Sequence, residues 1–197
     1  MRPPIRMTGR VTTSRAAGLF AVTIVLAALP AHGQQGVYLT EREALAKAFS
    51  HGEAVRRVPL QPSLTVRTQI ERAAGVPLLP TWVRCFQGTL KGHVVGYACI
   101  DNMIGKERPI TYIIRIDHPA GRIAFVELMI YREAIGAEVR HPHFREQFEG
   151  KSVADPVRLR EDIQKISGAT LSSRALSDGA RKILHLYQHY LRHLPPQ

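Results

Sequence analysis

The sequence predicts an α+β fold, in which an antiparallel sheet of about four strands is flanked by helices and a long helix ends the chain. Three patterns lead to this expectation: two short helical segments near residues 40 and 70, four β-type runs between residues 82 and 132, and an extended helical repeat near the C-terminus. The chain has 197 residues, of which 45% are hydrophobic and 22% charged. This size and composition suit one compact domain.

Capping and glycine signals mark the ends of the helices. Thr40 and Glu43 form a capping box, and Ser63 and Gly75 bound a second helix over residues 63–74. A short helix is expected over residues 143–148, closed by Gly150. The last helix is expected from about residue 172 to residue 194, because an apolar stripe continues along it through Leu176, Ala180, Ile183, Leu184, Tyr187, Leu191 and Leu194.

The β-type runs cover residues 82–87, 93–100, 109–117 and 121–132. Lys91-Gly92 is a turn signal, so the first two runs should form a hairpin that brings Cys85 close to Cys99. That register allows a disulfide, whereas a slip of one residue leaves two buried thiols, and the sequence leaves both outcomes open. The third run alternates and predicts one solvent-facing side, and the fourth is apolar and predicts a central strand.

The first 33 residues have the pattern of an export signal. Four arginines and no acid precede an apolar run from Ala16 to Leu29, and small residues at Ala31 and Gly33 suit cleavage after Gly33. We therefore expect a signal peptide over residues 1–33 and a single domain over residues 34–197. Because this apolar run is shorter than the roughly 20 residues of a membrane-spanning helix, an uncleaved anchor is the less favoured alternative.

Charge and cysteine content narrow the choice of partners. The chain carries 27 basic and 16 acidic residues, and loss of the signal segment leaves 23 basic residues and a formal charge of +7. An exported domain is poorly placed to meet nucleic acid, so the charge favours acidic redox partners or an anionic membrane surface, or serves solubility alone. Two cysteines suit an oxidising compartment, and the lack of Cys-x-x-Cys-His excludes a c-type haem.

The segment Ser167-Gly168-Ala169-Thr170 carries the strongest signal for chemistry. It lies directly before the last helix, where backbone N–H groups and the helix dipole favour a phosphate. Gly168 and Ala169 leave the backbone open to close approach, and Thr170 presents a hydroxyl. Helix-end electrostatics contribute only about 0.3–2 kcal/mol, so other contacts must retain a ligand. On spacing alone, an ordinary helix N-cap is the alternative interpretation.

Residues 97–184 resemble the FMN-binding domain found in the covalent-flavin subunits of Rnf complexes and of sodium-translocating NADH:quinone oxidoreductases, and in exported single-domain relatives. These domains share the motif Ser/Thr-Gly-Ala-Thr-x-Ser/Thr-Ser, which is complete here from Ser167 to Ser173. They also place a loop with a glutamate and a glycine after the central strand, as at residues 133–136. The resemblance implies FMN as cofactor, joined to the protein by a phosphoester, with the binding residues Thr170, Ser167, Gly168, Ala169, Leu171, Ser172, Glu133, Ile135 and Gly136.

The same resemblance implies a partner that attaches the flavin. A threonine hydroxyl is a poor nucleophile, and no histidine or cysteine lies beside Thr170 in the sequence to activate it. A separate flavin transferase is therefore expected, which uses FAD and a metal ion, joins FMN to Thr170 and releases AMP. The flavin ring is expected toward the sheet and the 133–136 loop, where Tyr112, Met129 and Tyr131 are either wall residues or ordinary core residues.

Other groups receive a simpler interpretation. Arg174 is either a phosphate contact or a solvated side chain. His185, His189 and His193 recur at every fourth residue, and we interpret their helix face as solvated rather than as a metal site. A serine hydrolase is discounted because the Gly-x-Ser-x-Gly elbow is missing.

These inferences predict an exported electron-transfer flavoprotein, periplasmic or on the outer face of the cytoplasmic membrane. It would exchange electrons with a membrane or periplasmic redox partner and have no catalytic residues of its own. The alternative is a non-flavinylated binding or accessory domain of the same fold. That alternative rests on Gln164, because relatives commonly carry an acid six residues before the modified threonine, whereas the acid of this chain is Asp162.

Overall fold

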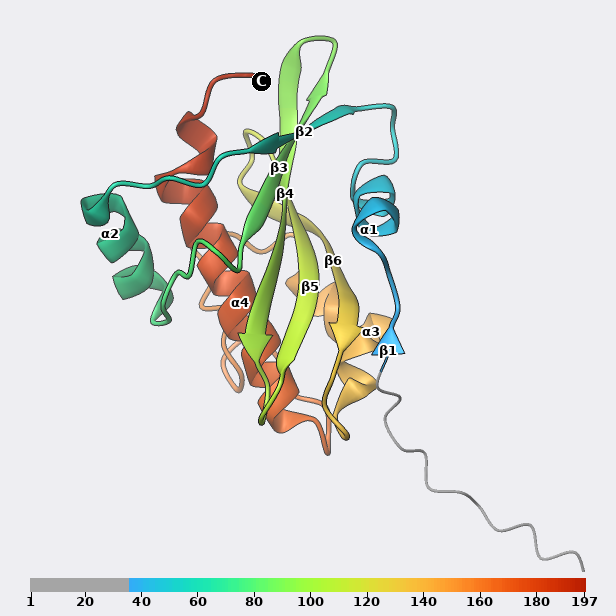
Figure 1. Cartoon of the computed structure of the whole chain (residues 1–197). Coiled ribbons are helices and arrows are strands. Elements are labelled where there is room, and N and C mark those ends of the chain that lie inside the picture. Colours follow the sequence, from blue (N-terminus) through green and yellow to red (C-terminus); the bar gives the residue numbers. More distant parts are fainter. Residues whose placement is uncertain (1–35) are drawn as a thin grey trace, which may run out of the picture. The chain divides into compact units, whose positions relative to one another are not determined.

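The computed structural model describes residues 36–197, and the predicted signal segment lies outside them. Six antiparallel strands form one sheet in the order β1-β6-β5-β4-β3-β2 (Figure 1). The strands are β1 Gly36–Val37, β2 Ala54–Val58, β3 Arg84–Leu90, β4 His93–Ile104, β5 Pro109–Asp117 and β6 Arg122–Tyr131. The helices are α1 Glu41–Ala48, α2 Leu64–Ala74, α3 Pro142–Arg145 and α4 Thr170–His189, with 3-10 turns at Ala137–Arg140, Glu146–Phe148 and Leu191–His193.

The four predicted strands are confirmed as β3 to β6, but the estimate of about four strands was too low. The two missed strands are both edge strands. β1 has two residues, and β2 carries two arginines and is exposed at four of its five positions. Neither strand shows the apolar alternation from which a half-buried strand is predicted.

Helices cover both faces of the sheet, so the solvent-facing side predicted for residues 109–117 was wrong. On one face, α4 packs on β4 and β5, and α2 packs on α4. On the other face, α1 and Phe49 pack with Ile113 and Met129 in a second, smaller core. Even Thr111, on the supposedly wet side, is only 5% exposed. The pattern of β5 alone did not reveal this second cover, because α1 comes from a distant part of the sequence.

The helix ends confirm the capping signals. Thr40 and Glu43 form the capping box of α1, the Ser63 side chain caps α2, and Gly75 ends α2 in the left-handed conformation. The helix α4 begins at Thr170, two residues earlier than predicted, and ends at His189. In the part of the chain that the structure describes, no helix combines the length and apolar character needed to cross a membrane.

The hairpin of β3 and β4 decides between the two outcomes predicted for Cys85 and Cys99, a disulfide or two buried thiols. Lys91 and Gly92 form its turn, both with positive φ, and Cys85 lies directly opposite Cys99. The two residues form a disulfide. The register is thus the one that allows the bridge, rather than the slipped one.

Replacing both cysteines by alanine is expected to lower the free energy of unfolding by about 3 kcal/mol, because a bridge that closes a loop of about 15 residues restricts the unfolded chain by that amount. Urea unfolding of the oxidised wild type and of the double variant measures the difference. A thiol reductant should lower the stability of the wild type and leave the variant unchanged. Equal stability of the two oxidised proteins would contradict the prediction.

Candidate functional site

Thr170 begins a helix that no side chain caps. The N-cap residue is Ala169, and the first backbone hydrogen bond of α4 runs from the Ser173 N–H to the Ala169 carbonyl (2.8 Å). The alternative of an ordinary serine or threonine N-cap is therefore wrong. The N–H groups of the first turn lie ahead of that first hydrogen bond, so they are available to an external acceptor.

The turn before the helix is open to close approach. Ser167 and Gly168 are exposed, and Gly168 has a φ of +79°. A Cβ atom added at Gly168 would meet no other atom within 4 Å. The structure thus agrees with the expectation of an accessible backbone at this point.

The two serines of the motif hold the helix in place. Ser172 is buried, and its hydroxyl lies 2.8 Å from that of Tyr131, which donates its own proton to the Ile135 carbonyl. Ser172 is therefore the donor to the Tyr131 oxygen. Ser173 is also buried, and its hydroxyl accepts a hydrogen bond from the Ile166 N–H (3.4 Å). These serines fix the geometry around Thr170 from inside the protein.

The glycine of the 133–136 loop lies against the first turn of α4. Gly136 has a φ of +99°, and a Cβ atom added there would lie 2.7 Å from both the Ser172 and the Tyr131 hydroxyl oxygens. It would also lie 3.6 Å from the Ala169 Cα atom. The structure therefore brings together the two segments that the sequence assigned to one site, although more than 30 residues separate them.

Glu133 has a structural task in this loop. Its side chain is buried, and its Oε1 atom accepts hydrogen bonds from the N–H groups of Glu107 (2.7 Å) and Arg108 (2.8 Å). Burial raises the pKa of Glu133, but the hydrogen bonds from Arg108, Glu107 and Lys106 outweigh it, so the pKa lies below its ordinary value. The carboxylate thus stays charged and ties the loop to the turn between β4 and β5.

Two exposed apolar side chains flank this contact between the 133–136 loop and the first turn of α4. Ile135 is 71% exposed and Leu171 is 46% exposed, and each is next in sequence to a residue of the contact between the loop and the helix. By contrast, Tyr112, Met129 and Tyr131 are buried and belong to the core. Of the two interpretations of these three residues, ordinary core packing is confirmed.

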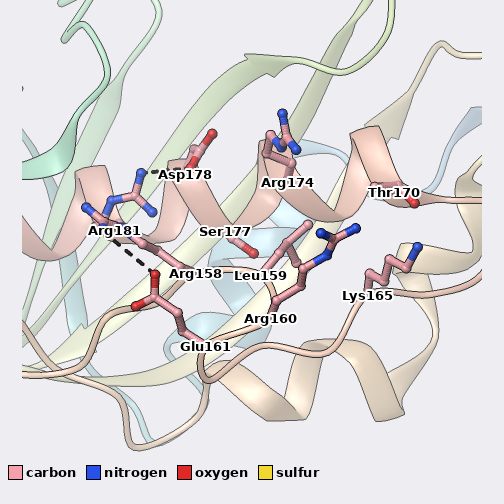
Figure 2. A pocket seen from close by; sticks show the side chains of 10 residues that line it. All are labelled: Arg158, Leu159, Arg160, Glu161, Lys165, Thr170, Arg174, Ser177, Asp178 and Arg181. Atoms are coloured by element: carbon pink, nitrogen blue, oxygen red, sulfur yellow. Dashed lines mark hydrogen bonds and ion pairs between the residues drawn. The ribbon is translucent and has the colours of Figure 1, made fainter.

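A groove opens beside Thr170, between α4 and residues 158–165. We call it the Thr170 groove; its volume is about 280 Å³, and it is lined by Arg158, Leu159, Arg160, Glu161, Lys165, Thr170, Arg174, Ser177, Asp178 and Arg181. Thr170 lies at one end and Arg181 toward the other (Figure 2). The sequence had suggested only Arg174 as a phosphate contact. The opposite wall was missed, because residues 158–165 have no periodic pattern.

The cations of the groove fall into two groups. Arg181 is held by Asp178 (2.7 Å) and by the carbonyls of Ala74 and Val157, and Arg158 pairs with Glu161 (3.9 Å) (Figure 2). No described residue forms a hydrogen bond or ion pair with the side chain of Arg160, Lys165 or Arg174. Both acids of the groove are thus paired with arginine, and three cations near Thr170 remain available to an anion.

Asp162 does not replace the acid that relatives carry at the position of Gln164. Its carboxylate accepts hydrogen bonds from the Val157 and Arg158 N–H groups and pairs with Lys151 (2.9 Å). Burial raises the pKa of Asp162, but these partners outweigh it and hold the pKa below its ordinary value. The main chain of Gln164 is held by the Gln147 side chain. Both residues therefore shape the wall of the groove.

The histidine face of α4 is less exposed than predicted. Arg181, on the same face, is buried and bound to the end of α2, and His185 and His189 are half-buried with stacked rings 5.9 Å apart. Burial first, and then the charges of His189 and Arg181, lower the pKa of His185. The prediction of a solvated face is confirmed for Arg192 and His193, which are exposed. It was wrong for the part of the face that carries Arg181, His185 and His189, because α2 packs there. Among residues 36–197, no group of three or more potential ligands is placed to hold a metal ion.

The arrangement fits FMN in three respects: free N–H groups and cations suit its phosphate, the Thr170 hydroxyl can carry it, and Ile135 and Leu171 offer apolar surface to its ring. No curated protein matches the chain. Residues 105–185, which include the loop, the groove and Thr170, match the family model described as FMN-binding domain. The chain therefore carries a domain of the FMN-binding family, and is a flavoprotein with FMN as its cofactor.

Proposed function

We propose that this protein is an exported electron carrier whose FMN is joined to Thr170 through a phosphoester. The observation that carries the proposal is the position of the Thr170 hydroxyl. This hydroxyl belongs to Thr170, the first residue of α4 and the last of a complete Ser-Gly-Ala-Thr motif, and no side chain caps this helix. Thr170 also lines the Thr170 groove, where three cations have no partner among the described residues. A phosphate linked there would receive backbone N–H groups on one side and positive charge on the other.

The surroundings of Thr170 favour a carrier over an enzyme that converts a small substrate. Bound FMN supplies reversible acceptance of electrons, and the protein retains, orients and partly exposes it. Glu133 is engaged with main-chain N–H groups, and Glu161 and Asp178 are paired with arginines, so these three carboxylates are occupied. The exposed Ile135 and Leu171 would leave the ring accessible to a redox partner.

Two features support an exported location, in the periplasm or on the outer face of the cytoplasmic membrane. Residues 1–33 have the composition of a signal peptide. The disulfide between Cys85 and Cys99 persists in an oxidising compartment and is rare in the cytosol. A membrane or periplasmic redox partner would then supply or remove the electrons.

Intact mass spectrometry tests the attachment. Co-expression with a flavin transferase is expected to add the mass of FMN less one water to the wild type and nothing to Thr170→Ala. Thr68→Ala serves as the matched control, because Thr68 also lies on an exposed helix face, and it should gain the same mass. The mass also reports the N-terminus, which would be Gln34 after cleavage.

The same preparation separates the alternatives. A yellow colour that survives denaturation indicates covalent FMN, and colour that is released indicates FMN bound without a covalent link. A protein that gains no mass with an active transferase would refute attachment at Thr170. The exposed Gln164, where relatives carry an acid, makes this comparison informative.

A further inference from the structure

We propose that the outer edge of β2 binds an extended, acidic segment of a partner protein, which adds to the sheet as a further strand. Three features carry this inference: an open main-chain edge, a cluster of arginines without acidic partners, and an apolar groove beside the strand. None of them involves a residue assigned to FMN, so the inference does not depend on the attachment at Thr170.

The main chain of β2 is open along one side. β2 is the last strand of the sheet (Figure 1), and it pairs with β3 from Ala54, opposite Thr89, to Val58, opposite Cys85. Along its other side, residues 54–58 form no main-chain hydrogen bond with any part of residues 36–197. An edge strand of this kind presents a row of N–H and C=O groups with which an extended segment can pair.

Three arginines beside this edge have no acidic partner. Arg56 and Arg57 are consecutive residues of β2, and Arg42 lies in the first turn of α1. All three are exposed, and within the described part of the chain none of their side chains forms a hydrogen bond or an ion pair. Successive side chains of a strand alternate between its faces, so Arg56 and Arg57 lie on opposite faces. An acidic segment added to β2 would therefore meet positive charge on both of its faces.

The neighbouring acids are already engaged. Glu41 pairs with Arg84 (2.9 Å), and Glu43 closes the capping box of α1. The side chain of Glu53, the residue before β2, is 2% exposed and pairs with Arg115 (3.2 Å). The edge of β2 therefore keeps a positive charge that an acidic partner would complement.

The arginines disfavour a second copy of this chain as the occupant. Two β2 strands paired with each other would place the arginines of one copy opposite or diagonal to those of the other. Like charges across a strand pair are destabilising, and charged side chains on an edge strand protect a sheet from such pairing. An acidic strand removes this repulsion, so the residues that oppose self-association favour an acidic partner.

An apolar groove beside β2 offers room for a side chain of the added strand. We call it the β2 groove; it lies between α1 and the edge formed by β2 and β3, and its volume is about 530 Å³. Its apolar lining consists of Leu45, Ala46, Phe49, Val55 and Phe86. Arg42, Arg57 and the paired Glu41 line it as well. A segment with a large apolar residue between two acids of the same face would place the apolar side chain in the groove and the acids beside the two arginines.

A synthetic peptide tests the proposal. The probe is acetyl-Thr-Glu-Glu-Phe-Glu-Glu-Thr-amide, and calorimetry at low ionic strength measures its affinity for the full-length protein with the disulfide intact. Arg56→Gln and Arg57→Gln are each expected to weaken binding about threefold, the effect of one exposed ion pair. The matched control is Arg108→Gln, because Arg108 is also exposed but lies in the turn between β4 and β5, beyond the far end of β4. This control should leave the affinity unchanged.

Methylation of the peptide nitrogens tests the strand pairing itself. A strand that adds to β2 directs the N–H groups of alternate residues toward it. Methylation of one alternate set should therefore abolish binding, and methylation of the other set should leave it intact. The bound peptide should also slow the hydrogen exchange of the outward N–H groups within residues 54–58 about tenfold. A peptide with lysine in place of each glutamate should not bind.

Four results would overturn the proposal. The first is that the acidic peptide does not bind, which would leave the arginines as protection of an exposed edge. The second is that it binds wild type, Arg56→Gln and Arg57→Gln equally well. The third is that the two methylated peptides behave alike or that exchange within β2 is unchanged, which would indicate attraction by charge alone. The fourth is that vesicles of phosphatidylcholine and phosphatidylglycerol bind more weakly to both variants while the peptide does not bind, which would assign the arginines to a membrane surface.

Discussion

Lys182→Met is expected to lower the free energy of unfolding by about 3–5 kcal/mol, because it leaves a buried carboxylate without its counter-ion. The Lys182 ammonium lies 2.8 Å from the Asp101 carboxylate, and both side chains are almost fully buried, with exposures of 3% and 0%. Asp101 also accepts hydrogen bonds from the Tyr112 hydroxyl (2.5 Å) and from the Asn102 N–H (2.7 Å). Burial, followed by the charge of Asp101, raises the pKa of Tyr112, so the phenol stays protonated and acts as the donor.

Urea unfolding at neutral pH, with the disulfide intact, measures this effect. The double variant Lys182→Met, Asp101→Leu should recover much of the loss, because replacing both partners of a buried ion pair by apolar residues is often neutral or stabilising. Lys106→Met is the matched control, since Lys106 pairs with Glu107 on the surface, and its cost should be below 1 kcal/mol. A loss at Lys182 no larger than this control would show that the pair does not stabilise the fold.

The ion pair matters for the site because it fixes α4 on the sheet. Gly179, one turn before Lys182, faces Tyr112 so closely that an added Cβ atom would lie 2.0 Å from the phenol oxygen. The helix α4 therefore approaches β5 at a glycine, because a residue with a Cβ atom does not fit there. The ion pair between Lys182 and Asp101 joins α4 to β4 nearby. The position of Thr170, two to three turns earlier on a rigid helix, follows from these contacts.

The sequence predicted the structural features whose signal is local. It did not predict those that depend on packing between distant segments. Thr40, Glu43, Ser63 and Gly75 mark helix ends by their own hydrogen-bonding or backbone preferences, and the structure confirms each of them. The Ser167–Ser173 motif is contiguous and could be recognised directly. Lys182 was not recognised as a core residue, because lysine is almost never fully buried unless it is paired, and its partner Asp101 lies 81 residues away in the chain.

The wall of the Thr170 groove that comes from residues 158–165 could not be predicted either, because its shape depends on contacts made only in the folded chain. Residues 158–165 form an irregular segment in which Arg160 has a φ of +68°, and the preceding Val157 has a φ of +48°. Non-glycine residues adopt this conformation rarely, so no propensity rule predicts it. The segment is held by Asp162, whose contacts to its main chain become visible only when the chain is folded. For this reason Arg174 could be suggested from the sequence, whereas Arg160 and Lys165 could not.

Gly136→Ala is expected to lower the free energy of unfolding by about 2–5 kcal/mol and to slow FMN attachment. A φ of +99° costs a non-glycine residue about 1–2 kcal/mol, and overpacking adds about 1–3 kcal/mol. The added Cβ atom would lie 2.7 Å from the hydroxyl oxygens of Ser172 and Tyr131, which are buried and hydrogen-bonded to each other. Relief of this overlap requires the loop to move away from the first turn of α4. Urea unfolding measures the loss of stability, and the rate of the FMN mass gain measures the slower attachment.

Gly92→Ala is the control that separates the cost of a positive φ from the cost of steric overlap in Gly136→Ala. Gly92 has a similar φ of +82°, but an added Cβ atom would meet nothing within 4 Å, and the residue lies in the β3–β4 turn. This variant should lose only about 1–2 kcal/mol and should gain FMN at the wild-type rate. Attachment is compared at a temperature where all three proteins are folded, so that slower attachment in Gly136→Ala reports a displaced Thr170 rather than unfolding. If Gly136→Ala behaves as Gly92→Ala does in both measurements, the contact between the loop and the helix does not position the anchoring hydroxyl.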